Sequence, residues 1–440
     1  MIKVVKFGGS SLASAEQFKK VGNIIRAEES RRYVVPSAPG KRFAEDVKVT
    51  DMLYACYKAA VSGQDFENRF DEIKARYNGI ISELGMELSL EKEYEAIAAG
   101  FKGRAGRDYA ASRGEFLNGI ILAKYLGYEF IDAADVVFFN EDGTFNADMT
   151  NQTLHERLEG VERAVIPGFY GSEPDGSVKT FSRGGSDVTG SIVAKAIHAD
   201  LYENWTDVSG FLMADPTIVK NPKGITHITY SELRELSYMG ASVLHEEAIF
   251  PVKEANIPIH ILNTNRPQDA GTIIQEHSKV KSGYPITGIA GKKDFMSIYV
   301  YKKHMSNEVG FIRKALSILE KYHISIEHIP SGIDSFNIVV EKKEIEESLY
   351  EILAHFKDEL KPDKLTVQED LALISTVGKN MSDKPGTSGK LFGALGKNNI
   401  NIVMIAQGSD EINITVGVKK KDFTKTVQVI YDTFVGGNEE

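Results

Sequence analysis

The chain has 440 residues, of which 42% are hydrophobic and 26% are charged. This composition is typical of a soluble globular protein, and the length suggests two to three domains. The formal net charge is −10 and no basic tract is present, which argues against nucleic acid as a partner. No apolar run is long enough to span a membrane, and the first residues do not resemble a signal peptide. We therefore expect a cytoplasmic protein.

The single cysteine, Cys56, lies in an apolar stretch that reads as a helix. One cysteine excludes an internal disulfide and a cysteine-based zinc site. We interpret Cys56 as a core residue rather than as a nucleophile.

A glycine-rich turn follows the first predicted strand. Residues 4–7 predict a short buried strand, which ends at Gly8-Gly9 before a helix predicted over residues 14–27. Backbone N–H groups at such a turn bind anions, and Lys6 adds a positive charge. The lysine precedes the glycines, so the pattern is not that of a P-loop. An ordinary turn with a surface lysine is the alternative at this point.

The following elements alternate between strands and helices. Further strands are predicted over residues 33–35, 130–133, 136–139, 164–169 and 257–262, and residues 41–127 are predicted to be mainly helical. The apolar run 164–169 is typical of a strand buried on both faces. This alternation predicts an α/β fold, with a mainly parallel sheet covered by helices on both faces. Polar, turn-rich residues around 268–284 suit a domain boundary.

A second glycine-rich turn is formed by residues 182–187, before a helix predicted over residues 191–198. The planar guanidinium of Arg183 suits a carboxylate, whereas an N-cap role for Ser186 or Asp187 is the simpler interpretation. Ligands of parallel sheets bind at the carboxyl ends of strands, so two such turns suggest a nucleotide and an acid in one crevice. In a third motif, a predicted strand ends in Thr206-Asp207, polar groups that could contact a base or a ribose. Trp205, which precedes them, is as likely to be a core residue as part of that site.

The C-terminal part contains an internal repeat. Residues 310–340 align without a gap to residues 386–416, and 12 of the 31 positions are identical. Each copy predicts a strand, a helix, two strands and a helix, which is close to the ferredoxin-like pattern. A single unit of this size has a thin core, so we expect the two copies to pack side by side.

Together these motifs resemble the aspartokinases of the amino-acid-kinase family. The matching stretches are Lys6-Phe7-Gly8-Gly9-Ser10-Ser11, Ser182-Arg183-Gly184-Gly185-Ser186-Asp187, Trp205-Thr206-Asp207-Val208, and Gly40-Lys41-Arg42-Phe43 with Val49-Thr50-Asp51. The C-terminal repeats resemble paired ACT domains, which are ferredoxin-like (βαββαβ). The resemblance implies a catalytic domain at residues 1–280 and ACT domains at 285–370 and 371–440.

The implied reaction is transfer of the ATP γ-phosphoryl group to the β-carboxylate of aspartate, at the start of lysine, threonine and methionine synthesis. The resemblance assigns the catalytic residues as Lys6, Arg183 and Asp187. It assigns aspartate binding to Ser37, Thr50, Glu115, Arg183, Gly184 and Ser186. It assigns ATP binding to Lys6, Gly8, Gly9, Ser10, Thr206, Asp207, Leu212, Ser242 and Val243. Mg²⁺ is expected on the nucleotide rather than in a protein metal site.

The nucleotide side departs from the family pattern. Ser242 stands where a lysine is usual, Leu212 where a tyrosine is frequent, and Thr217 where an arginine is frequent. Two alternatives therefore stay open. One is a kinase with another acceptor, such as glutamate, acetylglutamate or a nucleoside monophosphate. The other is an amino-acid-sensing protein with a degenerate kinase site.

The resemblance also implies regulation and assembly. The residues that match lysine-binding positions of lysine-sensitive relatives are Met305, Gly310, Ser325, Ile326 and Glu327. We expect lysine as the effector, rather than threonine or none, although these residues could simply build the ACT fold. Pairing of ACT sheets implies a homodimer or homotetramer.

Overall fold

The computed structural model describes residues 1–182, 184–241, 244, 246–277, 283–382 and 384–436. The chain divides into two compact units. The first comprises Met1–Phe211, Thr226–Tyr230 and Val243–Ser278, and the second comprises Leu212–Ile225, Ser231–Ser242 and Lys279–Glu440.

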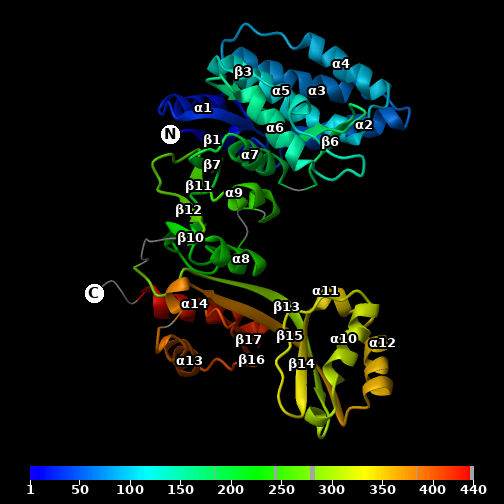
Figure 1. Ribbon diagram of the computed structural model, residues 1–440, viewed down its shortest axis with the longest axis vertical. Helices are drawn as coiled ribbons and strands as arrows, with labels where there is room; N and C mark the ends of the chain where they lie inside the picture. Colours follow the sequence, from blue (N-terminus) through cyan, green and yellow to red (C-terminus); the bar gives the residue numbers. More distant parts are fainter. Residues whose placement is uncertain (183, 242–243, 245, 278–282, 383, 437–440) are drawn as a thin grey trace. The chain divides into compact units, whose positions relative to one another are not determined.

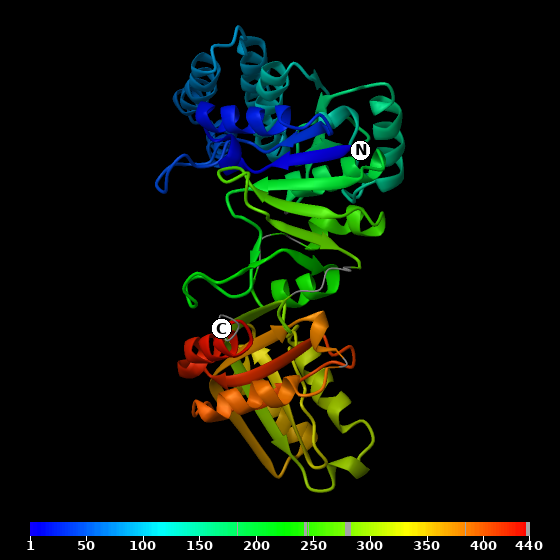
Figure 2. The same cartoon turned by 90° about the vertical axis from the view of Figure 1, so that its left-hand side faces the viewer.

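An eight-stranded sheet forms the centre of the first unit. Its strand order is β10-β12-β11-β7-β1-β2-β4-β3, and every described pair except β11 with β12 is parallel. Figure 2 shows β1 and β7 as adjacent arrows that point the same way. The strands are β1 (Lys3–Phe7), β2 (Arg31–Pro36), β3 (Glu129–Phe130), β4 (Ala164–Val165), β7 (Leu201–Thr206), β10 (His227–Thr229), β11 (Ile259–Asn263) and β12 (Thr272–Gln275).

Helices cover both faces of this sheet (Figure 1). Side chains of a strand alternate between faces, so Val5 and Phe7 join one hydrophobic core while Lys6 points to the opposite side. The core side has α1 (Ala15–Arg26), α2 (Val49–Val61), α3 (Glu67–Glu83), α4 (Glu91–Lys102) and α5 (Arg107–Leu126). On the Lys6 side α7 (Gly185–Ala196) contacts the sheet and also packs against α6 (Ala147–Leu158) and α9 (Phe250–Glu254). The predicted α/β fold is confirmed.

Some predicted strands are shorter or less regular than the sequence suggested. Residues 136–139 make only isolated bridges, because the Phe138 N–H donates to Thr150 Oγ1 at 2.9 Å instead of to a strand. The run 164–169 forms only the two-residue strand β4, although the N–H groups of Ile166 and Gly168 still donate to Val34 O and Pro36 O of β2. Pro167 has no N–H to continue the pairing on the side of β3. A hairpin of β5 (Tyr170–Ser172) and β6 (Val178–Thr180) was not predicted. The first unit also contains the 3-10 helices η1 (Gly9–Leu12), η2 (Ala133–Asp135) and η3 (Glu246–Ile249).

A five-stranded antiparallel sheet forms the centre of the second unit, in the order β14-β13-β15-β17-β16. Its strands are β13 (Gly288–Tyr301), β14 (Ser335–Glu341), β15 (Lys364–Val377), β16 (Met404–Ala406) and β17 (Asn413–Lys419). Its α-helices are α10 (Phe311–Lys321), α11 (Lys342–Ile345), α12 (Leu349–His355), α13 (Thr387–Lys397) and α14 (Phe423–Phe434). It also contains the 3-10 helices η4 (Met305–Asn307), η6 (Lys379–Met381) and η7 (Lys420–Asp422) and the π-helix η5 (Phe356–Leu360). The chain between β7 and β11 also contains β8 (Phe211–Leu212), β9 (Gly224–Ile225) and α8 (Tyr230–Tyr238).

The sequence repeat is a structural repeat. Strand β15 begins and ends 76 residues after β13, and α13 begins and ends 76 residues after α10. The residues 295–301 of β13 pair with β14, whereas residues 288–293 pair with the part of β15 that adjoins β17. A segment before the first copy therefore completes the sheet of the second. Because β13 and β15 run through both halves, the boundaries at 280, 285, 370 and 371 stay a prediction.

Candidate active site

A cluster of three polar side chains lies on the α7 side of β1, with Lys6 and Asn204 buried and Asp187 half-buried. Lys6 Nζ lies 2.6 Å from Asp187 Oδ1 and 3.4 Å from Asn204 Oδ1, and Asn204 Nδ2 donates to Asp187 Oδ1 at 2.8 Å. Lys6 is opposite Asn204 in the parallel register of β1 and β7. Asp187 belongs to the first turn of α7, which starts at Gly185 rather than at residue 191 as predicted. Asn204 was not among the predicted site residues, although a polar residue within an otherwise apolar strand could have indicated a site.

The Gly8-Gly9 turn lies at the carboxyl end of β1 and packs against a second backbone turn. The Gly40 N–H donates to Gly9 O at 2.8 Å, and a Cβ on Gly9 would stand 2.9 Å from Ala38 O. A Cβ on Gly8 would stand 3.7 Å from Lys6 Nζ, so the ammonium lies beside this turn. Ser10 is half-buried in η1, which begins directly after Gly8. The Gly8 N–H donates to Trp205 O at 3.0 Å, so the turn offers an anion the Lys6 ammonium and the backbone N–H groups at the start of η1.

The second glycine-rich turn is also closely packed. Gly184 has φ +57° and is the N-cap of α7. Ser186 is buried in the first turn of the helix, and a Cβ on Gly168 would stand 2.6 Å from the Ser186 Cβ. The backbone N–H of Phe169, a residue with φ +83°, donates to Thr189 Oγ1 at 3.0 Å. Arg183, the predicted carboxylate ligand, lies outside the described residues.

Glu115 is a buried carboxylate of α5 with few partners. It is 5% exposed and accepts a hydrogen bond from the backbone N–H of Ala38. Burial raises the pKa of Glu115 to about 8. Ser37 precedes Ala38, and Ser37 N donates to Phe7 O at 3.1 Å. Thr50 is half-buried in the first turn of α2.

The predicted nucleotide residues are placed in part. Thr206 ends β7, and its Oγ1 donates to Asp207 Oδ1 at 3.2 Å. Asn263 Nδ2 donates to Asp207 O at 3.2 Å. Leu212 belongs to the second unit and is 39% exposed. Ser242 and Val243 lie outside the described residues.

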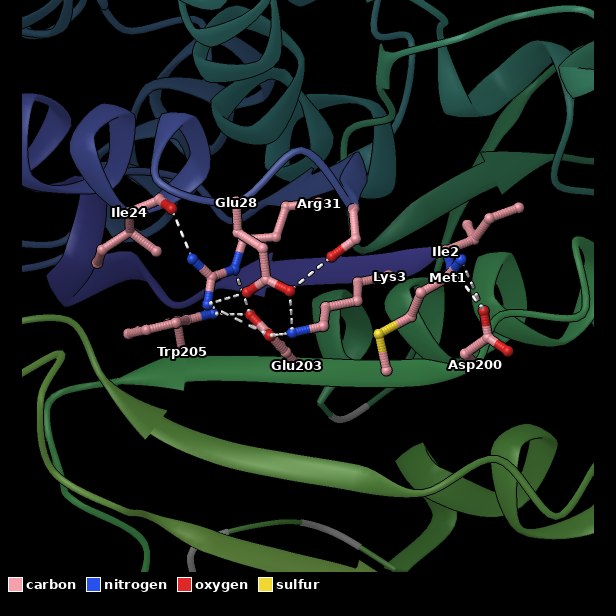
Figure 3. A network of polar contacts seen from close by, with 10 residues as sticks. Met1, Ile2, Lys3, Ile24, Glu28, Arg31, Asp200, Glu203 and Trp205 are labelled. Carbon is pink, nitrogen blue, oxygen red and sulfur yellow. Dashed lines mark hydrogen bonds and ion pairs between the residues drawn. The ribbon is translucent and has the colours of Figure 1, made fainter.

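A network of charged groups occupies the face of β1 and β7 opposite Lys6 (Figure 3). Glu203 is 1% exposed, and its carboxylate lies 2.9 Å from Lys3 Nζ and 2.8 Å from Arg31 Nε. Trp205 Nε1 donates to Glu203 Oε2 at 2.8 Å, and the indole stacks on Phe7 with the ring centroids 6.0 Å apart. Trp205 is therefore a core residue, whereas the sequence left core and ligand roles equal.

The arrangement suits phosphoryl transfer by charge and position. Lys6 and the backbone N–H groups at the start of η1 can stabilise phosphate oxygens. In the part of the chain that the structure describes, no group of three or more His, Cys, Asp or Glu residues could hold a metal ion. The described residues also contain no helix that is both long and apolar enough to cross a bilayer.

The comparisons with known proteins agree with this geometry. The model of the amino acid kinase family matches residues 1–263, and an ACT domain model matches residues 374–434. Aspartokinase 3 of Bacillus subtilis is 39% identical over 451 residues, which cover 99% of each chain. The chain belongs to the amino acid kinase family, among the aspartokinases. The predictions of a kinase fold and of ACT regulatory structure are thereby confirmed.

Solved aspartokinase structures resemble the chain over its whole length. Clostridium acetobutylicum aspartate kinase has a TM-score of 0.92 at 52% identity, covering 99% of this chain and 100% of that one. E. coli aspartokinase III with lysine and aspartate has a TM-score of 0.74 at 25% identity, covering 99% of each chain. The same enzyme with aspartate and ADP has a TM-score of 0.71 at 25% identity, covering 98% and 99%.

The predicted effector residues of this aspartokinase lie in the first ACT copy. Met305 is 6% exposed and packs with Ile326 in the hydrophobic core of that copy. Gly310, with φ +80°, is the N-cap of α10, and Ser325 is exposed. The hydroxyl of Tyr238 hydrogen-bonds the carboxylate of Glu327 within the second unit. The effector role of these residues stays a prediction.

Proposed function

We propose that the protein transfers the γ-phosphoryl group of ATP to the β-carboxylate of L-aspartate, giving 4-phospho-L-aspartate. This reaction would begin the synthesis of lysine, threonine and methionine. The observation that carries the proposal is the Lys6–Asp187–Asn204 cluster beside the Gly8-Gly9 turn. The aspartate complexes of E. coli aspartokinase III support the choice of acceptor.

Each residue has a physical role in this proposal. A β-carboxylate is ionised at neutral pH, so the nucleophile needs no general base. Lys6 would stabilise charge on the transferred phosphoryl group, while Asp187 and Asn204 hold its ammonium in place. Glu115 would bind the α-amino group, and Arg183 the α-carboxylate. Mg²⁺, when bound to the nucleotide, supplies charge neutralisation on the phosphate oxygens.

Regulation and assembly belong to the same proposal. Lysine would bind the first ACT copy, through Glu327, and inhibit the kinase. The lysine complex of E. coli aspartokinase III supports this assignment. ACT sheets would pair across a two-fold axis, giving a homodimer or a homotetramer.

A coupled assay tests the acceptor directly. The protein is incubated with MgATP and one acid, and acyl phosphate is trapped as the hydroxamate. We expect hydroxamate with aspartate and none with glutamate or N-acetylglutamate. A nucleoside monophosphate forms no acyl phosphate, so it is tested by the release of ADP, which we expect not to exceed the release without an acceptor. If only glutamate gives product, the acceptor is glutamate and the proposal of aspartate is wrong. If calorimetry shows no binding of ATP, the kinase site is degenerate.

A further inference from the structure

Two buried oxygen atoms of α5 have no hydrogen-bond partner among the described residues. They are Glu115 Oε2 and Asn118 Oδ1. Glu115 is 5% exposed and Asn118 is 0% exposed. Buried acceptors without donors are rare because their desolvation is costly, so they mark places where a ligand or an ordered water binds.

The orientation of the Asn118 amide is fixed by its other hydrogen bond. Asn118 Nδ2 donates to the backbone carbonyl of Ser37 at 2.7 Å. A carbonyl can only accept, so the amide nitrogen must face Ser37 and Oδ1 must face away from it. The carboxylate of Glu115 accepts from the next backbone N–H, that of Ala38. Both side chains are thus anchored to one short segment, and each keeps one oxygen free.

The two side chains are also neighbours on the helix. Residues three apart lie on the same face of an α-helix, with their Cβ atoms about 5–6 Å apart. An ammonium group carries three N–H donors, more than one carboxylate oxygen can accept from. Two acceptor oxygens on one face, one from an ionisable carboxyl and one from a neutral amide, match such a group.

We propose that Asn118 Oδ1 binds the α-ammonium group of the acceptor together with Glu115 Oε2, and so selects substrates with a free amino group. This inference rests on the proposed function, in which Glu115 meets that amino group. An N-acylated acid has one uncharged N–H and would leave an acceptor unpaired, and succinate would leave both unpaired. Discrimination of this kind is strong because buried polar groups lose their partners.

Paired ligands separate this role from a structural one. Binding of aspartate and of succinate to the full-length protein is measured by calorimetry for the wild type, Asn118→Ala and Asn118→Ser. The serine hydroxyl is too short to reach a ligand at the position of Oδ1. We expect each variant to lower the preference for aspartate over succinate by about tenfold, the size of one hydrogen bond to a charged group. The KM for aspartate should rise by a similar factor, with the KM for ATP unchanged.

Ser112→Ala is the matched control. Ser112 is also fully buried in α5, and its hydroxyl donates to Tyr109 O at 2.8 Å. This variant should leave the ligand preference unchanged. Equal weakening of both ligands in the Asn118 variants would mean that Asn118 only holds Ser37, and would overturn the inference. Failure of the wild type to phosphorylate aspartate would instead overturn the proposed function.

Discussion

Two lysines of β1 show how burial alone does not define a catalytic residue. Lys3 is 8% exposed and Lys6 is 7% exposed, and both form ion pairs. Lys3 pairs with Glu203 in the charged network on one face of the sheet, whereas Lys6 lies on the opposite face beside the Gly8-Gly9 turn. The difference in neighbours, not in burial or pairing, supports the proposed role of Lys6.

Substitutions of these two lysines should differ in their effects. Lys6→Ala should lower kcat by about 100-fold or more, because it removes a charge that stabilises the transition state. Lys3→Ala should lower the free energy of unfolding but leave kcat within a few-fold of the wild type. Steady-state kinetics and thermal unfolding of both variants are the measurements. A Lys6→Ala enzyme with near-normal turnover would remove Lys6 from the mechanism.

The pH dependence of aspartate binding follows from Glu115. Burial raises the pKa of Glu115 to about 8, so in the free enzyme its carboxyl is mostly neutral at pH 6 and mostly ionised at pH 9. The ammonium of aspartate binds the ionised form. We therefore expect the KM for aspartate to fall as pH rises from 6 to 8.5. A KM that is flat over this range would contradict the role of Glu115.

The raised pKa of Glu115 also affects stability: aspartate binding should improve as pH rises, whereas the stability of the unliganded protein should fall. A pKa that is higher in the folded state gives stability that is complete below the unfolded pKa and is lost as pH rises through the folded pKa. Ionised Glu115 therefore destabilises the unliganded protein above pH 8. Glu115→Gln, which is always neutral, should melt higher than the wild type at pH 9 and differ less at pH 6. Thermal unfolding at both pH values measures this.

At the scale of elements, the two glycines of the first turn differ in what surrounds them. A Cβ on Gly9 would stand 2.9 Å from Ala38 O and 3.1 Å from Gly40 N, whereas a Cβ on Gly8 would meet nothing closer than 3.6 Å. Gly9→Ala should destabilise the protein by about 1–3 kcal/mol, because backbone atoms must move apart. Gly8→Ala should cost less than half of that. Equal unfolding free energies in denaturant titrations would argue against this packing.

The network behind the sheet joins β1, β2 and β7 through Glu203 (Figure 3). Glu203→Gln leaves Lys3 and the partly buried Arg31 with Glu28 as their remaining carboxylate. We expect a loss of stability that approaches, but does not exceed, about 3–5 kcal/mol, the cost of a buried charge left without a partner. Asp200→Asn is the control in the same figure. Asp200 pairs with the Met1 ammonium at 3.9 Å and is exposed, so its loss should cost under about 1 kcal/mol. Chemical denaturation distinguishes the two.

At the scale of the whole molecule, the ACT repeat makes the proposed regulation testable. The repeat places Val403 in the second copy at the position of Glu327, so only the first copy offers a carboxylate there for the lysine side chain. Glu327→Gln should raise the lysine concentration for half-inhibition about tenfold, as expected for one hydrogen bond between charged groups, without changing kcat. Inhibition assays over a range of lysine concentrations measure the shift.

The control for this prediction is Tyr238→Phe, which removes the hydrogen bond that Tyr238 makes to Glu327. With its carboxylate freed, this variant should be inhibited at an equal or lower lysine concentration. A wild type that lysine does not inhibit would end the effector proposal and leave the kinase proposal standing.

The sequence by itself determined much of this protein. Apolar periodicity predicted β1, α1 and the helical region before α5. Glycines marked the two turns that lead into η1 and α7, because glycine at a strand–helix junction is a local signal. The repeat fixed α10 and α13 at the same offset. The apolar pattern wrongly predicted a regular strand at residues 136–139, where the hydroxyl of Thr150 accepts the hydrogen bond that a neighbouring strand would accept.

Only the tertiary structure decided which distant residues meet. Asn204 joins Lys6 because β7 is the neighbour of β1, and Asn118 meets Ser37 because α5 packs on β2. Residues 288–293 complete the half-sheet of the second copy, although they precede the first. Periodicity reports whether a side chain is buried, but the order of strands in a sheet depends on long-range packing that no local pattern contains.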